Sequence, residues 1–432
     1  MAACYEQHDW IILGGTAAGR LAAQQATRSG LRVALIEPLE SETRPWAELL
    51  VSQGAALAAG TIDWRSLQRQ AQWHDRLWGD QRAALAAGGV DCLVGDGLLM
   101  RHRNQWRVQL GDRLLAGRRC LLALPGRSTV PLWTERAPVA AYTPDTIAQL
   151  AHRGVRPGER WLVTADSPMA IELAQVLRGL GAQVTLAAAG DRVLGGLPAA
   201  AAKWLQAELE AQAIEVILRA APQQCKVLEG QTWIQVGDRA REVDCLLTDG
   251  NYQALLPKGF EQLCPRAIGI GDWPANDRLQ LPLAPELYGC GALLGGHPIG
   301  AIAATEAQLI IRNSLQNPIQ RPHCIRYEQQ PWAVRGPLPL ALVGGGEGPK
   351  LRTATLTLAA GRCQIQHDHQ GQLQGALLLA LGAIEAISTV AALMARSGTV
   401  ADLAHLPATE SPAIDLLRRT AQQALIADRF RQ

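Results

Sequence analysis

The sequence lacks any pair of cysteines in C-x-x-C or zinc-binding spacing, although nine cysteines occur among its 432 residues. They are scattered along the chain, and several stand in apolar, strand-like runs, such as Cys120 and Cys245. Scattered thiols of this kind are typical of reduced, buried cysteines in a cytosolic protein. The cysteines therefore predict neither a disulfide framework nor a metal site, and we expect a cytoplasmic protein.

The sequence also lacks a charge imbalance and a long apolar run. Its 41 basic and 39 acidic residues leave a net charge of +2, which gives no overall attraction to nucleic acid or to an anionic membrane. No run approaches the ~20 apolar residues of a membrane-spanning helix. The first residues show no basic segment followed by an apolar core, so no secretory signal is expected. We expect no nucleic-acid partner and no membrane span.

The most informative pattern stands at the start of the chain, where an apolar strand runs into a glycine turn and a helix. Residues 10–13 form a short apolar run of the kind found in buried parallel strands. A helix is expected at residues 17–29 and a second strand at residues 32–36, which ends at Glu37. The glycine turn and the first residues of this helix together comprise six residues: Gly14, Gly15, Thr16, Ala17, Ala18 and Gly19.

This order has a chemical consequence for the turn and for Glu37. A helix N-terminus directs unpaired N–H groups at a pyrophosphate, and an acid after the second strand accepts hydrogen bonds from a ribose. Glu37 follows Gly14 by 23 residues, close to the ~20 of dinucleotide-binding units. Thr16 replaces the middle glycine, where its side chain crowds a pyrophosphate while its hydroxyl could donate to one. We expect a dinucleotide site; the alternative is a doubly wound sheet with a vacant or degenerate pocket.

A second unit of the same design follows about 150 residues later. It has a strand at residues 161–165, a helix at 168–180 and a strand at 183–187. All three glycines of its turn are replaced, by Ala165, Ser167 and Ala170. Asp166 would set a negative charge beside a pyrophosphate, and the acid expected after the second strand is replaced by alanines 187–189. The changes predict a unit that keeps the fold but binds a dinucleotide poorly or not at all.

Two later segments complete the pattern. Residues 265–272 read as a short apolar strand ending at Gly271 and Asp272, whose carboxylate either accepts from ribose or ribityl hydroxyls or closes an ordinary turn. From about residue 325 onward, strands are followed by helices, which is the order of an α+β domain. His367 and His369 alternate on one of these strands, and we interpret them as surface residues rather than metal ligands.

With these segments in the right order, nearly the whole chain resembles the pyridine nucleotide-disulfide oxidoreductases, such as dihydrolipoamide dehydrogenase and mercuric reductase. The likeness rests on residues 9–19 with Glu37, the Glu172-Leu-Ala-Gln run, residues 268–272 and the C-terminal domain. In this family the first unit binds FAD, the second binds NAD(P)H, and the last domain forms a homodimer. The resemblance implies an α/β fold with two Rossmann-like FAD/NAD(P)-binding domains and a C-terminal α+β dimerisation-type domain.

The resemblance also implies domain boundaries and cofactor contacts. The implied domains are the FAD-binding domain in two parts (residues 1–150 and 251–320), a degenerate NAD(P)-binding-like domain (151–250) and a dimerisation-like domain (325–432). FAD is the implied cofactor, whereas NAD(P)H is doubtful. The residues implied to hold FAD are Gly14, Gly15, Thr16, Ala17, Ala18, Gly19, Glu37, Gly271 and Asp272.

The sequence departs from the family along the path that electrons take beyond the flavin. The family's redox dithiol belongs just after the acid of the second strand, but residues 38–60 contain no cysteine, and the lysine that follows the dithiol is missing. The family's acid/base histidine falls at Pro407, so His405 replaces it only if the loop shifts. Pro125 stands where the family has a glycine. The sequence therefore predicts no dithiol chemistry and no catalytic residue.

Two functions from different classes follow from this asymmetry. The first is a flavoprotein oxidoreductase that exchanges electrons directly with a small molecule or a protein, neither of which the sequence identifies. Cys290 is a remote candidate for a substitute thiol in this case, because nothing beside it in sequence would lower its pKa. The second is a non-catalytic relative that keeps the fold, with or without FAD, as a scaffold or interaction protein.

Overall fold

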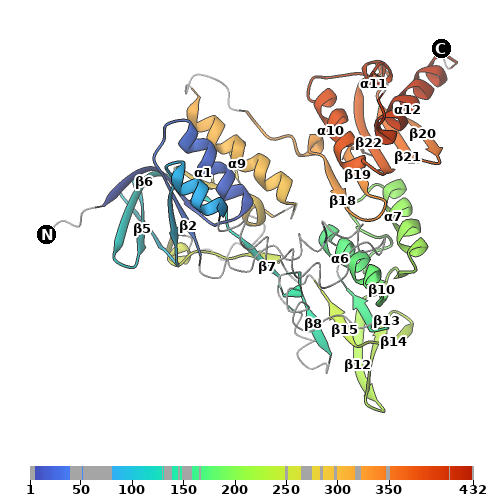
Figure 1. The fold of residues 1–432 in the computed structure, drawn as a ribbon, viewed down its shortest axis with the longest axis horizontal. Helices are drawn as coiled ribbons and strands as arrows, with labels where there is room; N and C mark the ends of the chain where they lie inside the picture. The colour runs from blue at the N-terminus through green and yellow to red at the C-terminus, as the bar shows by residue number, and fades with distance from the viewer. Residues whose placement is uncertain are drawn as a thin grey trace. The chain divides into compact units, whose positions relative to one another are not determined.

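In the computed structural model, the chain forms two compact units (Figure 1). Unit 1 comprises residues 1–44, 70–129 and 251–325, and unit 2 comprises residues 45–69, 130–250 and 326–432. The structure describes residues 5–38, 51, 80–128, 130, 139–144, 146–147, 158–164, 167–248, 252–263, 275–282, 286–295, 299–316, 323–346, 351–407 and 409–430. Gly271 and Asp272 lie outside these described residues, as do Ala165 and Asp166.

Unit 1 is built on a seven-stranded sheet with the order β3-β2-β1-β6-β5-β4, in which β17 also pairs with β6. Five strands run parallel, and β4 and β5 are antiparallel to their neighbours. The strands are β1 (Glu6–Leu13), β2 (Val33–Glu37), β3 (Asp91–Val94), β4 (Leu98–His102), β5 (Gln105–Leu110), β6 (Arg113–Leu122) and β17 (Leu287–Gly289). The first predicted strand, turn, helix and strand are thus β1, the turn, α1 (Ala17–Arg28) and β2.

The central strand β1 is buried on both faces because its side chains alternate between two apolar clusters. Trp10 and Ile12 pack with α1 and with α9 (Gly300–Leu315), which lie side by side on one face of the sheet (Figure 1). Ile11 and Leu13 pack on the opposite face, in a cluster that includes Phe260. This double burial explains the unbroken apolar run that predicted the strand.

From sequence, residues 90–94, 106–110 and 114–115 are expected to form strands of a small antiparallel sheet, and for residues 90–94 this expectation is wrong. These residues form β3, which pairs in parallel with β2 at the edge of the main sheet. A separate buried strand is expected from sequence at residues 119–124, but it and residues 114–115 belong to one long strand, β6. Two arginines, Arg118 and Arg119, interrupt its apolar pattern, but the register with β1 continues past them to Leu122.

Smaller elements complete unit 1. Two short strands, β7 and β16, form an antiparallel pair. Unit 1 also contains two short helices and one further helical stretch. These elements are β7 (Gly126–Ser128), β16 (Tyr252–Ala254), α8 (Phe260–Leu263), the 3-10 helix η4 (Gly291–Leu293) and the helical residues 80–87.

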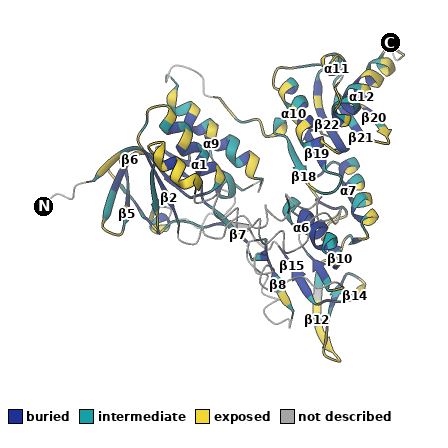
Figure 2. Ribbon diagram, viewed as in Figure 1, coloured by how far each residue is buried: buried dark blue, intermediate teal, exposed yellow. Residues whose placement is uncertain are grey.

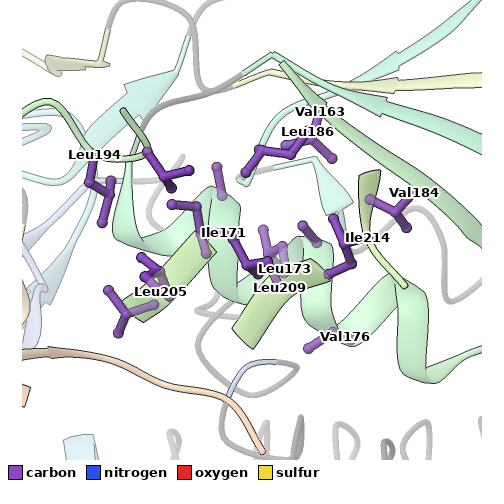
Figure 3. Close-up of a cluster of buried hydrophobic side chains, with 14 of the residues drawn as sticks. Val163, Ile171, Leu173, Val176, Val184, Leu186, Leu194, Leu205, Leu209 and Ile214 are labelled. Atoms are coloured by element: carbon purple, nitrogen blue, oxygen red, sulfur yellow. The ribbon is translucent and has the colours of Figure 1, made fainter. Parts of the chain in front are cut away.

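Unit 2 repeats the strand–helix–strand design around a parallel sheet with the order β11-β10-β9-β15-β8. Helix α6 packs over it with eight consecutive buried residues, 170–177, and Figure 3 shows its Ile171, Leu173 and Val176 in the core. The elements are β8 (Ala140–Tyr142), β9 (Arg160–Val163), α6 (Pro168–Gly179), β10 (Gln183–Ala187), α7 (Ala199–Ala211), β11 (Glu215–Ile217), β15 (Cys245–Leu247) and an antiparallel sheet of β12 (Pro222–Leu228), β13 (Gln231–Val236) and β14 (Arg239–Glu242).

The C-terminal part of unit 2 is a five-stranded antiparallel sheet, order β18-β19-β22-β21-β20, covered by helices on one face. In β22, Leu377 and Leu379 face the core around α6, whereas Ala376 and Leu378 face α10 and α12, so residues 375–380 of this strand are all buried. Figure 2 shows the strand mostly in the dark blue of buried residues. The elements are η5 (Tyr327–Gln329), β18 (Trp332–Val334), β19 (Leu340–Gly344), β20 (Arg352–Leu358), β21 (Gly361–His367), β22 (Leu373–Ala380), α10 (Ala383–Met394), α11 (Val400–Ala404) and α12 (Pro412–Arg429).

The α/β fold class is confirmed, whereas one prediction about the C-terminal sheet is wrong. His369 is exposed as predicted, but His367 is 1% exposed because it shares the inner face of β21 with Cys363 and Ile365. Its Nδ1 donates to the carbonyl of Asp368 at 2.9 Å, and its Nε2 lies 3.7 Å from Asp428 Oδ2. Within the described residues, no helix is long and apolar enough to cross a membrane.

Candidate functional site

The turn between β1 and α1 is shaped by close approaches that only glycine permits. A Cβ on Gly14, whose φ is +115°, would lie 2.0 Å from the carbonyl oxygen of Ala123. A Cβ on Gly19 would lie 2.3 Å from the carbonyl oxygen of Gly14. The two glycines therefore let α1 begin directly against the end of the sheet. Both belong to the glycine pattern that the sequence shows at the end of the first strand and the start of the first helix.

Thr16 is the N-cap of α1 and is unstrained there, with φ −65° and ψ 161°. Its hydroxyl accepts from the Gly19 N–H at 3.2 Å and donates to the carbonyl of Ala123 at 2.9 Å. The threonine thus supplies a side-chain acceptor for one of the N–H groups that a helix start leaves unpaired. Its hydroxyl proton is committed to Ala123, so the expected donation from Thr16 to a ligand is not made in this conformation.

The helix start still offers backbone donors for an anion. The N–H groups of Ala17 and Ala18 have no intrahelical acceptor, and no hydrogen bond from either is made within the described residues. Ala17 is exposed, so this end of α1 is accessible. Two free N–H groups and the positive end of the helix dipole fit a pyrophosphate group without any change to Thr16.

Glu37 is buried against the same turn and paired with a residue that the sequence analysis did not consider. Its side chain is 6% exposed, and a Cβ on Gly15 would lie 2.8 Å from its Cγ. Arg20 Nη2 lies 2.7 Å from Glu37 Oε1, and Arg20 Nε donates to the carbonyl of Gly15 at 3.2 Å. Arg20 therefore joins the turn to the acid at the end of β2.

A signal for this pair exists in the sequence. Arg20 stands three positions before Ala23 on the inward face of α1, where every other buried residue is alanine or glycine. A charged residue on a buried helix face requires a partner of opposite charge, because an unpaired buried charge is costly. The closest acid at the end of a neighbouring strand is Glu37.

Burial and charge set the ionisation of the groups around Glu37. Burial lowers the pKa of the Arg20 guanidinium, and the neighbouring Glu37 carboxylate opposes that shift. On β3, opposite Leu35, burial raises the pKa of the Cys92 thiol, and the charge of Glu37 raises it further. Cys92 is therefore a thiol rather than a thiolate near neutral pH.

The second turn has fewer donors than the first. Ser167 caps α6 as Thr16 caps α1, accepting from the Ala170 N–H at 3.1 Å. The first residue of α6 is Pro168, which has no N–H. The start of α6 therefore offers one uncapped backbone N–H, that of Met169. The start of α1 offers two, those of Ala17 and Ala18.

The Glu172-Leu-Ala-Gln run of α6 is directed at the segment after β18. The backbone N–H of Arg335 donates to Glu172 Oε1 at 2.7 Å, and Gln175 Nε2 donates to the carbonyl of Arg335 at 2.9 Å. Both side chains are buried. These polar groups of α6 therefore stabilise the packing of the C-terminal sheet on the second strand–helix–strand unit.

Seven of the nine cysteines lie within the described residues, and one of these seven is exposed. No disulfide joins the described cysteines, which are Cys92, Cys120, Cys225, Cys245, Cys290, Cys324 and Cys363. Burial raises the pKa of the Cys290 thiol, and the charge of Glu306 adds to that shift.

His405 caps the end of α11 with its Nδ1 2.7 Å from the carbonyl of Ala401. Within the described chain, no group of three or more His, Cys, Asp or Glu side chains could hold a metal ion.

Comparison with known proteins identifies the relatives of this chain. The family model for pyridine nucleotide-disulphide oxidoreductase matches residues 8–250, more than half of the sequence. No curated protein sequence matches significantly. Among solved structures, the HOCl-induced flavoprotein disulfide reductase RclA from Escherichia coli is 20% identical, covers 96% of this chain and 99% of its own, and has a TM-score of 0.80. LpdA from Mycobacterium tuberculosis is 17% identical, with coverage of 96% and 99% and a TM-score of 0.81. At these identities the structural likeness supports the fold.

Proposed function

The chain belongs to the pyridine nucleotide-disulphide oxidoreductases, and we propose that it is an FAD-dependent oxidoreductase that works without the family's dithiol. Bound FAD supplies two-electron redox chemistry to such a site. The observation that carries the proposal is the turn from Gly14 to Gly19, where glycine contacts set the start of α1 and leave the N–H groups of Ala17 and Ala18 for a pyrophosphate.

Three further positions belong to the same proposal. Glu37 accepts from the adenosine ribose, as an acid at the end of the second strand does in dinucleotide-binding units. Gly271 and Asp272 hold the middle of the FAD chain, by the resemblance of residues 268–272 to the family. Thr16 contributes by fixing the start of α1 through Ala123.

The absence of a dithiol is supported by sequence and by thiol environment. Residues 38–60 contain no cysteine, and burial raises the pKa of Cys120 and of Cys290, whereas a working redox thiol needs a lowered pKa and access. Electrons therefore pass directly between the flavin and a small molecule or protein. RclA, described as a flavoprotein disulfide reductase, is similar in fold, but this chain lacks the cysteine pair expected of that chemistry.

The second unit is proposed to bind NAD(P)H weakly or not at all. Its turn lacks glycine at all three positions, and Pro168, which has no N–H, removes one of the donors that the start of α1 offers to a pyrophosphate. Reduction by another donor is expected.

A homodimer is also proposed from the resemblance. The apolar side of α10 is buried within unit 2 and is not available for contact with a second copy. At the end of α12, Ile426 is 56% exposed and Phe430 is 87% exposed. These side chains are the better candidates for contact with a second copy.

One observation favours the non-catalytic alternative. Glu37, the proposed ribose acceptor, is already paired with Arg20, and Thr16 already satisfies Gly19 and Ala123. A scaffold that has lost its cofactor would satisfy its former ligand-binding groups internally in this way.

The visible absorption spectrum of the purified protein separates the two functions. It is recorded after incubation with FAD and removal of free flavin, then again without oxygen after NADH or NADPH. The proposal predicts a flavin spectrum that persists after NAD(P)H and bleaches with a chemical reductant. A flavin spectrum that NAD(P)H bleaches would restore the second unit as a working site. A colourless protein that takes up no FAD would establish the scaffold instead.

A further inference from the structure

Arg20 is a cation held within the protein at the point where the turn, α1 and β2 meet. Its side chain is 7% exposed, and it contacts the turn through the carbonyl of Gly15 and the strand end through Glu37 Oε1. Glu37 Oε1 is buried without a hydrogen-bond partner within the described residues, and its ion pair with Arg20 Nη2 is the contact that holds it. This ion pair fixes one oxygen of the carboxylate beside Arg20 and leaves Oε2 to face an incoming group.

We propose that Arg20 is a positioning residue for the adenosine ribose of the dinucleotide, acting through Glu37. The inference rests on the proposed FAD-binding function and names the residue that makes its ribose acceptor work. By holding Oε1, Arg20 fixes the orientation of the carboxylate, so that Oε2 is presented to the 2′- and 3′-hydroxyls.

The physical need for Arg20 follows from the burial of Glu37. A buried charge without a partner of opposite sign is costly, so a carboxylate in this place without Arg20 would turn outward toward water. A carboxylate that has turned away no longer makes the strong hydrogen bonds of a charged acceptor to the ribose. The hydrogen bond from Arg20 to the Gly15 carbonyl also fixes Arg20 relative to the turn. Because the proposed pyrophosphate site is in this turn, Arg20 would hold Glu37 at a set distance from the pyrophosphate.

The test compares two ligands that differ by one hydroxyl. Binding of FAD is followed by quenching of flavin fluorescence, and ADP and 2′-deoxy-ADP are measured as competitors. Variants Arg20→Met, Arg20→Lys, Glu37→Gln and the double variant Arg20→Met/Glu37→Gln are compared with the wild type, each first checked for folding by circular dichroism. Arg20→Lys keeps the charge and serves if Arg20→Met does not fold.

The inference predicts a wild type that prefers ADP to 2′-deoxy-ADP by about tenfold, the worth of one hydrogen bond to a charged group. Arg20→Met loses that preference and binds FAD about tenfold more weakly, with Arg20→Lys in between. In the Glu37→Gln background, Arg20→Met has no further effect, because Arg20 acts through Glu37.

Three results would overturn it. An Arg20→Met variant that keeps the preference for ADP would show that Glu37 needs no positioning. Tighter FAD binding by Arg20→Met or Arg20→Lys would show that Arg20 competes with the ribose. A wild type that binds neither FAD nor ADP would remove the proposed function itself, and this inference with it; the first two results would leave the proposed function intact.

Discussion

Thr16 and Ala123 lie 107 residues apart in sequence and are joined by a hydrogen bond of 2.9 Å from Thr16 Oγ1 to the Ala123 carbonyl. The same hydroxyl accepts from the Gly19 N–H, so one side chain connects the end of β6, the turn and the first turn of α1. A position that looks like a defect in a glycine fingerprint is therefore a structural contact.

Replacing Thr16 by alanine should loosen the start of α1. The change removes an N-cap, which costs about 1 kcal/mol, and leaves a carbonyl without its donor, which adds about 1 kcal/mol. Hydrogen–deuterium exchange should be faster in the peptide that spans α1, with little change in unit 2. Thr305→Ala is the matched control, because among the described residues the Thr305 hydroxyl bonds only to the carbonyl of Ala301 within α9. Equal exchange in the two variants would contradict the role of the cap.

Replacing Gly19 by alanine should destabilise unit 1, although alanine is the better helix former. The new Cβ would lie 2.3 Å from the Gly14 carbonyl oxygen and 3.1 Å from Ala123 Cβ, and such overpacking costs about 1–3 kcal/mol. Gly196→Ala is the control, since nothing lies within 4 Å of its Cβ position. Urea denaturation followed by tryptophan fluorescence measures both. A Gly19→Ala protein as stable as the control would show that the close approach is not required.

The strand–turn–helix–strand order was predictable because each of its parts leaves a local trace in sequence. The apolar run of β1 reflects burial on both faces, and Gly14 reflects a positive φ. The partner of Glu37 left only a weak trace, a single arginine on a small-residue helix face. The parallel pairing of β3 left none, because its side chains alternate no differently from those of an antiparallel edge strand.

The number of backbone N–H donors that each helix start offers to a ligand was predictable only in part. Loss of glycine at Ser167 and Ala170 suggested a degenerate site, but sequence does not reveal that the serine hydroxyl caps the Ala170 N–H. Capping depends on the backbone conformation at the helix start, which is a property of the folded turn. His367 was misjudged for a related reason, since alternation places it on one face of β21 without saying which face is inside.

Stability of unit 2 should fall in acid through Glu215, which joins β11 to β14. Arg241 binds both carboxylate oxygens, and with Thr185 it holds the pKa of Glu215 below its ordinary 4.5. A depressed folded pKa means stability that is present above about pH 4.5 and lost as the pH falls through the folded pKa. Because the pair is partly exposed, its contribution is under about 1 kcal/mol.

Glu215→Gln should therefore destabilise the protein near neutral pH, and the difference from wild type should shrink as the pH falls below about 4.5 and through the folded pKa. Denaturant midpoints across this range measure it. Glu328→Gln is the control, because Glu328 is exposed and has no ion pair within the described residues. A difference that is the same at every pH would show that the Glu215 charge does not matter.

The buried thiols should be inert in the folded protein. Burial raises the pKa of Cys363 to about 12 and also raises the pKa values of Cys120 and Cys290. Iodoacetamide at neutral pH should modify exposed Cys324 and spare these three, as mapped by mass spectrometry, and all should react in urea. Rapid modification of Cys290 in the native protein would revive it as a redox thiol.

The central claim is a flavin site without a dithiol, and an anaerobic reductive titration tests it most directly. A flavin alone accepts two electrons, whereas a flavin with a redox disulfide accepts four before reduction is complete. We predict that dithionite bleaches the FAD-reconstituted protein with one two-electron equivalent per bound flavin. Consumption of two equivalents per flavin would contradict the account, because it would require a second redox centre that the sequence between residues 38 and 60 does not provide.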